Sequence, residues 1–215
     1  MSLDPVLLRN GTILFLVLLA SICIHEWAHA IVADKLGDGT PRRDGRVTLN
    51  PAAHIDLFGT IILPLMCIFV IPGGFFLGWG RPVMTNPSYY RHPRRDDILV
   101  TAAGPLSNLG LALLAAILGG VATRFDPRVV ELALLVIRIN VFLAVFNLIP
   151  LPPLDGGNIM RHIVGMKEET YLRLAQWSFF IFLGLMFLQP VRVLLAVAMG
   201  VTALPFTHLL NLLAR

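Results

Sequence analysis

The sequence contains little charge. Only 14% of its 215 residues are Asp, Glu, Lys or Arg, whereas 56% are hydrophobic and the mean hydropathy is +0.77. In a soluble domain roughly a quarter of the residues would be charged. The composition therefore excludes an ordinary soluble domain and indicates a membrane-embedded protein. No hydrophilic stretch is long enough for a second domain, and we therefore expect one membrane-embedded domain over residues 1–215.

Cysteine is scarce as well. Cys23 and Cys67 both lie in apolar runs, where a thiol behaves as a small hydrophobic side chain, and we expect no disulfide between them. The net charge of +4 is modest and is spread over short loops. This distribution favours a role in membrane topology over binding to nucleic acid, and we expect no nucleic-acid partner.

Alternation of apolar and polar residues with period two is missing too. Since only closed barrels and helices satisfy their backbone in lipid, the sequence predicts an all-α polytopic membrane protein. About five to six apolar helical segments can be distinguished, against the roughly 20 residues that a membrane span needs. They cover residues 11–33, 57–77, 98–121, 130–150, 172–189 and 191–213.

The second segment is too short for an ordinary span. Its uninterrupted part, residues 57–71, contains Pro64 and ends at Pro72-Gly73-Gly74. Fifteen helical residues would reach only about 22 Å. We interpret residues 57–83 as a re-entrant helix-hairpin that returns to its starting side, with an extended, glycine-rich second arm.

The distribution of Lys and Arg supports this interpretation. If all six segments crossed the membrane, the basic residues would divide almost evenly between the two sides. If segment 57–83 is re-entrant and the N-terminus lies outside, most basic residues fall on the cytoplasmic side. The positive-inside rule prefers the second arrangement.

One group of polar residues interrupts the first apolar segment. His25 and His29 are four residues apart, so on a helix both imidazoles face the same side and can reach one ion. Zinc suits such a pair. Glu26, directly after the first histidine, stands where zinc hydrolases place the general base for the metal-bound water. The alternative is a pair of packed histidines with a snorkelling glutamate, but ionisable residues inside an apolar segment are costly and usually functional.

A catalytic zinc usually has three protein ligands, and Asp155 is the best third candidate. It follows the fourth segment in a stretch from Asn147 to Gly157 that contains three prolines and ends in two glycines. The prolines prevent the helix from continuing, and the glycines permit a bend and close backbone approach. On this local pattern alone, an ordinary loop aspartate at the membrane interface stays open as an alternative.

Together the two motifs resemble the site-2 protease family of intramembrane zinc metalloproteases. That family pairs His-Glu-x-x-His with Asn-x-x-Pro-x-Pro-x-Leu-Asp-Gly, which this sequence matches from Asn147 to Gly156. The resemblance implies that His25, His29 and Asp155 hold one Zn²⁺ per chain and that Glu26 is the base. It also implies that Asn147 binds the substrate backbone or the developing oxyanion.

Further stretches resemble the short bacterial branch of the family, which carries no PDZ or CBS domain. They are residues 46–51, 54–56, 78–83 and 103–108. We expect a catalytic core over about 11–165 and a C-terminal helical hairpin over about 170–213. The resemblance implies a single-span membrane protein substrate, for example an anti-sigma-factor-like regulator, and a place in the inner cell membrane. The requirement that His25 and Asp155 share one zinc independently favours the re-entrant arrangement, with the active site toward the cytoplasm.

Other polar residues have less certain roles. His54 and Asp56 could form a second polar site or cap the re-entrant helix, and we favour a structural role. Asn108 is a candidate for a cross-helix hydrogen bond or a place near the site. For His162, as for His92 and His208, we expect a solvated or interfacial position.

Two other functions compete with proteolysis. A zinc-bearing transporter would also use intramembrane His and Asp, but it needs neither a Glu after the first His nor a proline-rich aspartate loop. An inactive family member that acts as a binding partner is disfavoured by the intact Glu26.

Overall fold

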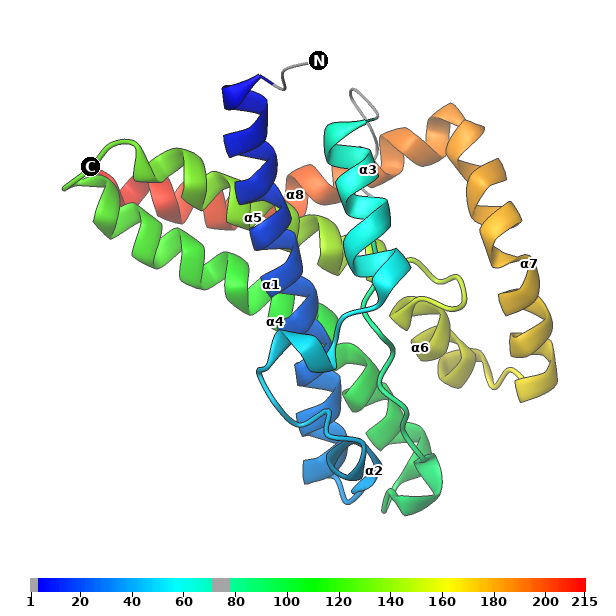
Figure 1. The fold of residues 1–215 in the computed structure, drawn as a ribbon. Coiled ribbons are helices and arrows are strands. Elements are labelled where there is room, and N and C mark those ends of the chain that lie inside the picture. The colour runs from blue at the N-terminus through cyan, green and yellow to red at the C-terminus, as the bar shows by residue number, and fades with distance from the viewer. Residues whose placement is uncertain (1–3, 71–77) are drawn as a thin grey trace. The chain divides into compact units, whose positions relative to one another are not determined.

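A computed structural model describes residues 4–70 and 78–215, and every regular element in these ranges is a helix (Figure 1). This confirms the all-α prediction. The chain forms two compact units, Met1–Arg91 and His92–Arg215. The elements are α1 (Pro5–Lys35), α2 (Thr40–Arg43), η1 (Pro51–Ala53), η2 (Leu57–Ile62), α3 (Leu63–Phe69), η3 (Pro87–Tyr89), α4 (Pro93–Thr123), α5 (Val129–Asn147), α6 (Asp155–Val164), α7 (Glu168–Phe187) and α8 (Gln189–Leu213).

Among the described residues, five helices are long and apolar enough to cross a membrane: α1, α4, α5, α7 and α8. The chain is therefore a multi-pass membrane protein. The remaining apolar helix, Leu57–Phe69, is shorter. This pattern agrees with the prediction of five to six apolar segments of which the second is too short for an ordinary span.

Helix α1 has clear sequence signals at both ends. The side chain of Asp4 accepts a hydrogen bond from the backbone N–H of Val6 at 2.9 Å, and Pro5 occupies the first turn, where its missing N–H costs nothing. After Lys35 the chain leaves the helix through Gly37, whose φ of 106° is accessible mainly to glycine. The 31 residues between these ends form one continuous helix.

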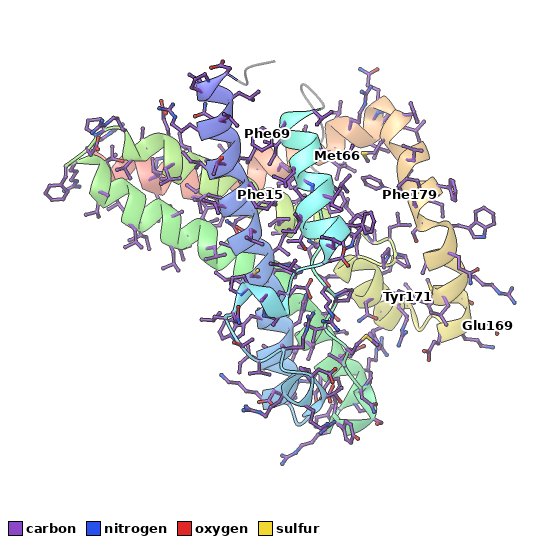
Figure 2. All side chains as sticks on the ribbon, in the orientation of Figure 1. Phe15, Met66, Phe69, Glu169, Tyr171 and Phe179 are labelled. Carbon is purple, nitrogen blue, oxygen red and sulfur yellow. The ribbon has the colours of Figure 1, made fainter. Side chains whose placement is uncertain are left out.

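The first unit also contains the predicted helix-hairpin. A π-helical turn, η2, leads into α3, and the side chain of Asp56 caps it by accepting from the N–H of Gly59 at 2.7 Å. Helix α3, which carries Phe69 (Figure 2), packs tightly on α1. A Cβ at Gly11 of α1 would lie only 2.6 Å from the ring of Phe69. The tip of the hairpin lies outside the described residues. Beyond the tip, the backbone N–H of Trp79 donates to the carbonyl of Gly59 at 3.1 Å. The chain therefore returns to η2, where the hairpin begins.

The second unit is built on α4, α5 and α8, which enclose an apolar core. Small residues allow these helices to approach closely. A Cβ at Gly119 of α4 would lie 2.3 Å from that of Ala133 in α5, and one at Gly120 would lie 2.7 Å from Leu213 in α8. The buried core residues are Ala112, Ala116, Ala133, Ile137, Val141 and Leu210.

Helix α7 is largely exposed. The structure describes all of α7, in which Ser178 is the only buried residue, and side chains such as that of Phe179 project away from the helix (Figure 2). An apolar surface of this kind suits contact with lipid. Only Leu188 separates α7 from α8, which packs on α4 and α5.

Candidate metal centre

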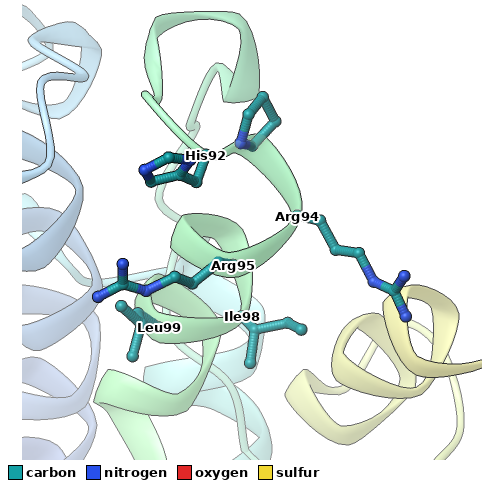
Figure 3. A pocket seen from close by; sticks show the side chains of 6 residues that line it. His92, Arg94, Arg95, Ile98 and Leu99 are labelled. Atoms are coloured by element: carbon teal, nitrogen blue, oxygen red, sulfur yellow. The ribbon is translucent and has the colours of Figure 1, made fainter.

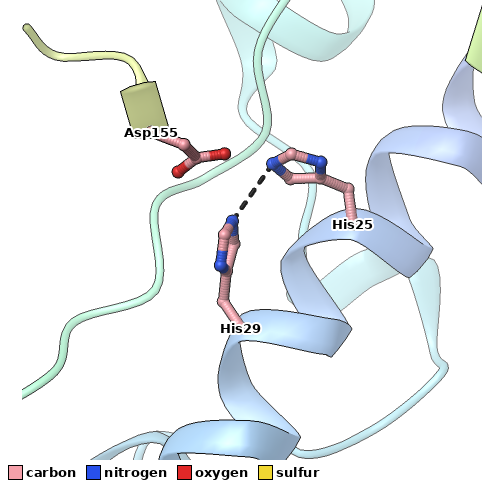
Figure 4. Close-up of side chains that lie close together, drawn as sticks. All are labelled: His25, His29 and Asp155. Atoms are coloured by element: carbon pink, nitrogen blue, oxygen red, sulfur yellow. Dashed lines mark hydrogen bonds between the residues drawn. The ribbon is translucent and has the colours of Figure 1, made fainter. Parts of the chain in front are cut away.

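Two histidines on α1 form the core of the candidate centre. His25 and His29 lie one turn apart, and Figure 4 shows their rings turned toward each other. Their Nε2 atoms are 3.1 Å apart, and the rings meet edge to face with centroids 4.7 Å apart. His25 is buried, and it lies in a helix that is long and apolar enough to cross a membrane. The prediction that both imidazoles face one side is confirmed.

The separation of these nitrogens fits a single zinc ion. Two imidazole nitrogens bound tetrahedrally at about 2.0–2.1 Å from zinc would be about 3.3 Å apart. The observed 3.1 Å is close to that value. Two ring nitrogens at this distance can share a proton or bind one cation. Imidazole nitrogen is one of the usual ligand atoms of zinc. His25 and His29 are therefore a suitable half of a zinc site.

Glu26 lies next to the backbone of the second arm of the hairpin, at Gly80. A Cβ at Gly80 would be 2.7 Å from Cγ of Glu26, 2.9 Å from its Oε1 and 2.9 Å from a methyl group of Ile22. These distances are shorter than ordinary van der Waals contacts. A residue with a Cβ could pass here only if the Glu26 side chain or its neighbours moved.

Backbone hydrogen bonds hold the segment around Gly80 in place. The backbone N–H of Trp79 donates to the carbonyl of Gly59, and the backbone carbonyl of Trp79 accepts from the hydroxyl of Thr60 at 2.8 Å. Two positions further on, the N–H of Arg81 donates to the carbonyl of His54 at 2.8 Å. The residues on either side of Gly80 are thus tied to the rest of the unit.

A buried arginine completes this anchorage. The guanidinium of Arg46 donates to the carbonyl oxygens of Ala53, Arg81 and Pro82, the last at 3.0 Å. Burial lowers the pKa of Arg46 below its ordinary value, and the negative charge of Glu26 opposes this shift. One side chain thereby joins the loop before the hairpin to the second arm of the hairpin.

His54 lies in the same loop and organises its backbone. The side chain is fully buried, and its Nε2 lies 2.8 Å from the carbonyl oxygen of Thr48. Asp56 caps the following helix, as described above. These contacts agree with the structural role that we favoured for both residues.

In the second unit, Asp155 is the first residue of α6 (Figure 4). Helix α5 ends at Asn147, as the prolines predict, and the chain then turns back on itself. A Cβ at Gly156 would lie 2.3 Å from the carbonyl oxygen of Leu148, and one at Gly157 would lie 2.5 Å from the carbonyl carbon of Leu151. Both glycines are needed because the start of α6 packs directly on the backbone of the preceding loop.

The two candidate asparagines have different surroundings. Nδ2 of Asn147 donates to the carbonyl of Leu143 at 2.9 Å, one turn back in α5. Asn108 is fully buried in α4, and its Nδ2 donates to Oδ1 of Asn140 in α5 at 2.9 Å. The predicted cross-helix hydrogen bond of Asn108 is confirmed.

For His162 we expected a solvated or interfacial position, and the solvated alternative is wrong. Its Nε2 lies 2.6 Å from Oδ2 of Asp97, and both side chains are largely buried. The signal was present in the sequence, since Asp97 and Thr101 on one helix, and Asn158 and His162 on another, each share a face. Nothing local indicated that these two faces meet.

A separate pocket lies at the start of α4 (Figure 3). Its walls combine basic side chains with apolar ones from the first turns of the helix. The lining residues are His92, Pro93, Arg94, Arg95, Ile98 and Leu99.

Comparison with known proteins gives a consistent family assignment. The model of Peptidase family M50 matches residues 13–189. YwhC of Bacillus subtilis, provisionally named a zinc metalloprotease, is 36% identical over 185 residues, which cover 82% of this chain and 80% of YwhC. Rip2 of Mycobacterium tuberculosis, named in the same way, is 32% identical over 179 residues, 80% of this chain but only 65% of Rip2. No solved structure matches.

Proposed function

Because this chain belongs to peptidase family M50, a family of zinc metalloproteases, we propose that it hydrolyses a peptide bond within or near a transmembrane segment of another membrane protein. The observation that carries the proposal is the paired nitrogens of His25 and His29, with Glu26 between them, on a helix apolar enough to span a membrane. Ionisable groups inside a membrane helix are energetically costly, and residues of this kind usually have a function.

The proposed ligand set is His25, His29 and Asp155, holding one zinc per chain. A catalytic zinc takes three protein ligands and keeps one position open, and the two histidines supply only two of them. Asp155 offers a carboxylate at a helix start that is fixed by glycine packing, and the family match includes all three residues. When bound, zinc would lower the pKa of a water molecule toward about 7 and polarise the scissile carbonyl.

Glu26 acts as the general base. It directly follows the first ligand on α1, so its carboxylate and the imidazole of His25 leave the helix at neighbouring positions. Glu26 takes a proton from the attacking water and later returns it to the leaving amine. Asn147, at the end of α5, is proposed to bind the substrate backbone or the oxyanion that develops during attack.

The proposed substrate is a single-span membrane protein. The carbonyls of a membrane helix are engaged in its own hydrogen bonds, so the substrate must unwind locally before it can be attacked. The segment at Gly80 can receive the unwound chain. The backbone groups of Trp79 and Arg81 form hydrogen bonds within their own unit. In an extended chain, the backbone N–H and C=O of the residue between them, Gly80, point in the opposite direction. Substrate added there as a strand would run beside Glu26.

The proposal also includes the location of the protein and its orientation in the membrane. We place the protein in the inner cell membrane with its N-terminus outside and its active site toward the cytoplasm, because this arrangement puts most Lys and Arg inside. Residues 1–215 would act as one catalytic domain, with about 11–165 as its core and the C-terminal hairpin packed beside it. By family resemblance, the substrate would be a regulator of the anti-sigma-factor type.

Reconstitution tests the proposal. The purified chain in lipid vesicles is incubated with a labelled single-span substrate, with and without a zinc chelator. We expect cleavage that stops with the chelator and returns when zinc, but not calcium, is added back. Cleavage that continues after zinc has been removed would rule out a zinc metalloprotease, and zinc flux without cleavage would favour a transporter.

A further inference from the structure

A ladder of polar contacts joins α4 to α6 within the second unit. Asp97 and Thr101 lie one turn apart on α4, and Asn158 and His162 lie one turn apart on α6. Nδ2 of Asn158 donates to Oγ1 of Thr101 at 2.7 Å and lies 3.4 Å from Oδ2 of Asp97. The same Oδ2 lies 2.6 Å from Nε2 of His162.

One further contact extends the ladder to the end of α6. The guanidinium of Arg94 donates to the carbonyl of Ile163 at 3.2 Å. Arg94, Asp97 and Thr101 follow one another at spacings of three and four along one face of α4. Together they reach the first turn of the helix that begins with Asp155, at Asn158, and its last turn, at His162 and Ile163.

The ladder lies largely out of water. The exposed fractions of the Asp97 and His162 side chains are 7% and 15%. A carboxylate removed from water needs hydrogen-bond partners, and breaking such a pair costs more than breaking one at the surface. Contacts of this kind fix geometry more firmly than exposed ion pairs do.

Helix α6 has little else to hold it. It has ten residues, a length at which a helix is marginal without tertiary contacts. The structure describes all of α6, and its only buried residues are Gly156 and Gly157, so no hydrophobic side chain of this helix is buried. The glycines fix its first turn against the preceding loop. The ladder supplies the hydrogen bonds of its later residues, where the guanidinium of Arg161 also lies over the ring of Tyr171, 5.2 Å from its centroid.

We propose that Asp97, Thr101, Asn158 and His162 are positioning residues that orient α6 and thereby aim the carboxylate of Asp155. The inference rests on the proposed role of Asp155 as a zinc ligand. Asp155 is the first residue of α6, so any tilt or rotation of this helix moves its carboxylate away from the ligand position. The four residues act through the helix and do not themselves bind the ion.

A double-mutant cycle on zinc affinity tests the proposal. Zinc dissociation constants of the full chain in detergent are measured by competition with a chelator of known affinity. Removal of a group that supports a metal ligand typically weakens metal binding 10–100-fold, and we expect about tenfold for Asp97→Ala. In an Asp155→Ala background, Asp97→Ala should have no further effect. A merely destabilising substitution would weaken zinc binding in both backgrounds.

Three variants sharpen the comparison. Asp97→Asn keeps an acceptor oxygen and should recover part of the zinc affinity. His162→Gln removes the contact between His162 and Asp97, and it replaces Asp97→Ala in the cycle if that variant does not fold. Ile163→Ala is the matched control, because this side chain of α6 is 65% exposed and only its backbone carbonyl joins the ladder. It should bind zinc like the wild type.

A second readout needs no zinc. In the zinc-free protein, hydrogen exchange of residues 155–164 should be faster in Asp97→Ala than in the wild type and unchanged in Ile163→Ala. If Asp155→Ala weakens zinc binding but Asp97→Ala changes neither affinity nor exchange, the positioning proposal fails and the proposed function stands. If Asp155→Ala keeps wild-type affinity, the ligand role of Asp155 fails and the positioning proposal falls with it.

Discussion

Replacing Gly80 by alanine should disable the enzyme without removing its zinc. The new Cβ would lie 2.7 Å from Cγ of Glu26 and 2.9 Å from its Oε1. Carbon atoms in ordinary contact are about 3.5–4.0 Å apart, so one of the two groups must move by about 1 Å. The backbone around Gly80 is held by hydrogen bonds of Trp79 and Arg81. The flexible glutamate side chain is therefore the group that yields.

The expected loss of activity follows from this displacement. A misplacement of about 1 Å at a reacting group can cost on the order of 100-fold in rate. We expect kcat for cleavage of a reconstituted single-span substrate to fall about 100-fold in Gly80→Ala. Bound zinc, measured by elemental analysis of the same sample, should stay at the wild-type level because neither histidine is touched.

A glycine in an open position provides the control. A Cβ at Gly110 in α4 would have nothing within 4 Å, and alanine is favoured over glycine in a helix. Gly110→Ala should therefore leave both cleavage and zinc content unchanged. Wild-type kcat in Gly80→Ala would refute the reasoning that places this backbone against the proposed catalytic carboxylate of Glu26.

Three further predictions concern the ligands and the framework. Asp155→Ala should lower zinc content in elemental analysis, and unchanged stoichiometry would contradict its role as a ligand. Asn108→Ala removes a buried cross-helix hydrogen bond and should lower the free energy of unfolding in detergent by about 0.5–2 kcal/mol, whereas an unchanged value would show that the contact with Asn140 contributes nothing. Arg46→Lys keeps the charge but cannot reach three carbonyls at once, so cleavage should fall while zinc content is retained. Normal cleavage by that variant would mean that the anchorage of the Gly80 segment is unimportant.

The sequence predicted most features that depend on a single helix. The long apolar runs become α1, α4, α5, α7 and α8, because lipid leaves a chain little choice but to satisfy its backbone within helices. The spacing of His25 and His29 was enough to predict that their rings meet, since four residues make one helical turn. The prolines after Asn147 likewise predicted the end of α5.

Features that depend on two distant segments were harder to foresee. His162 and Asp97 are 65 positions apart, and no local pattern indicates that α6 lies against α4. Arg46 looks like an ordinary loop arginine until its carbonyl partners on the far side of the hairpin are known. The role of Asp155 was likewise inferred from a family motif, because a lone aspartate after a proline-rich stretch has no distinctive spacing to a partner.

The central claim is that Glu26 performs chemistry at a zinc held by its neighbours on α1. Glu26→Ala tests it most directly, because the substitution removes the proposed base and leaves His25 and His29 in place. The purified variant should contain one zinc per chain, as the wild type does, and should not cleave the reconstituted membrane substrate. Cleavage at the wild-type rate by this zinc-loaded variant would contradict the account.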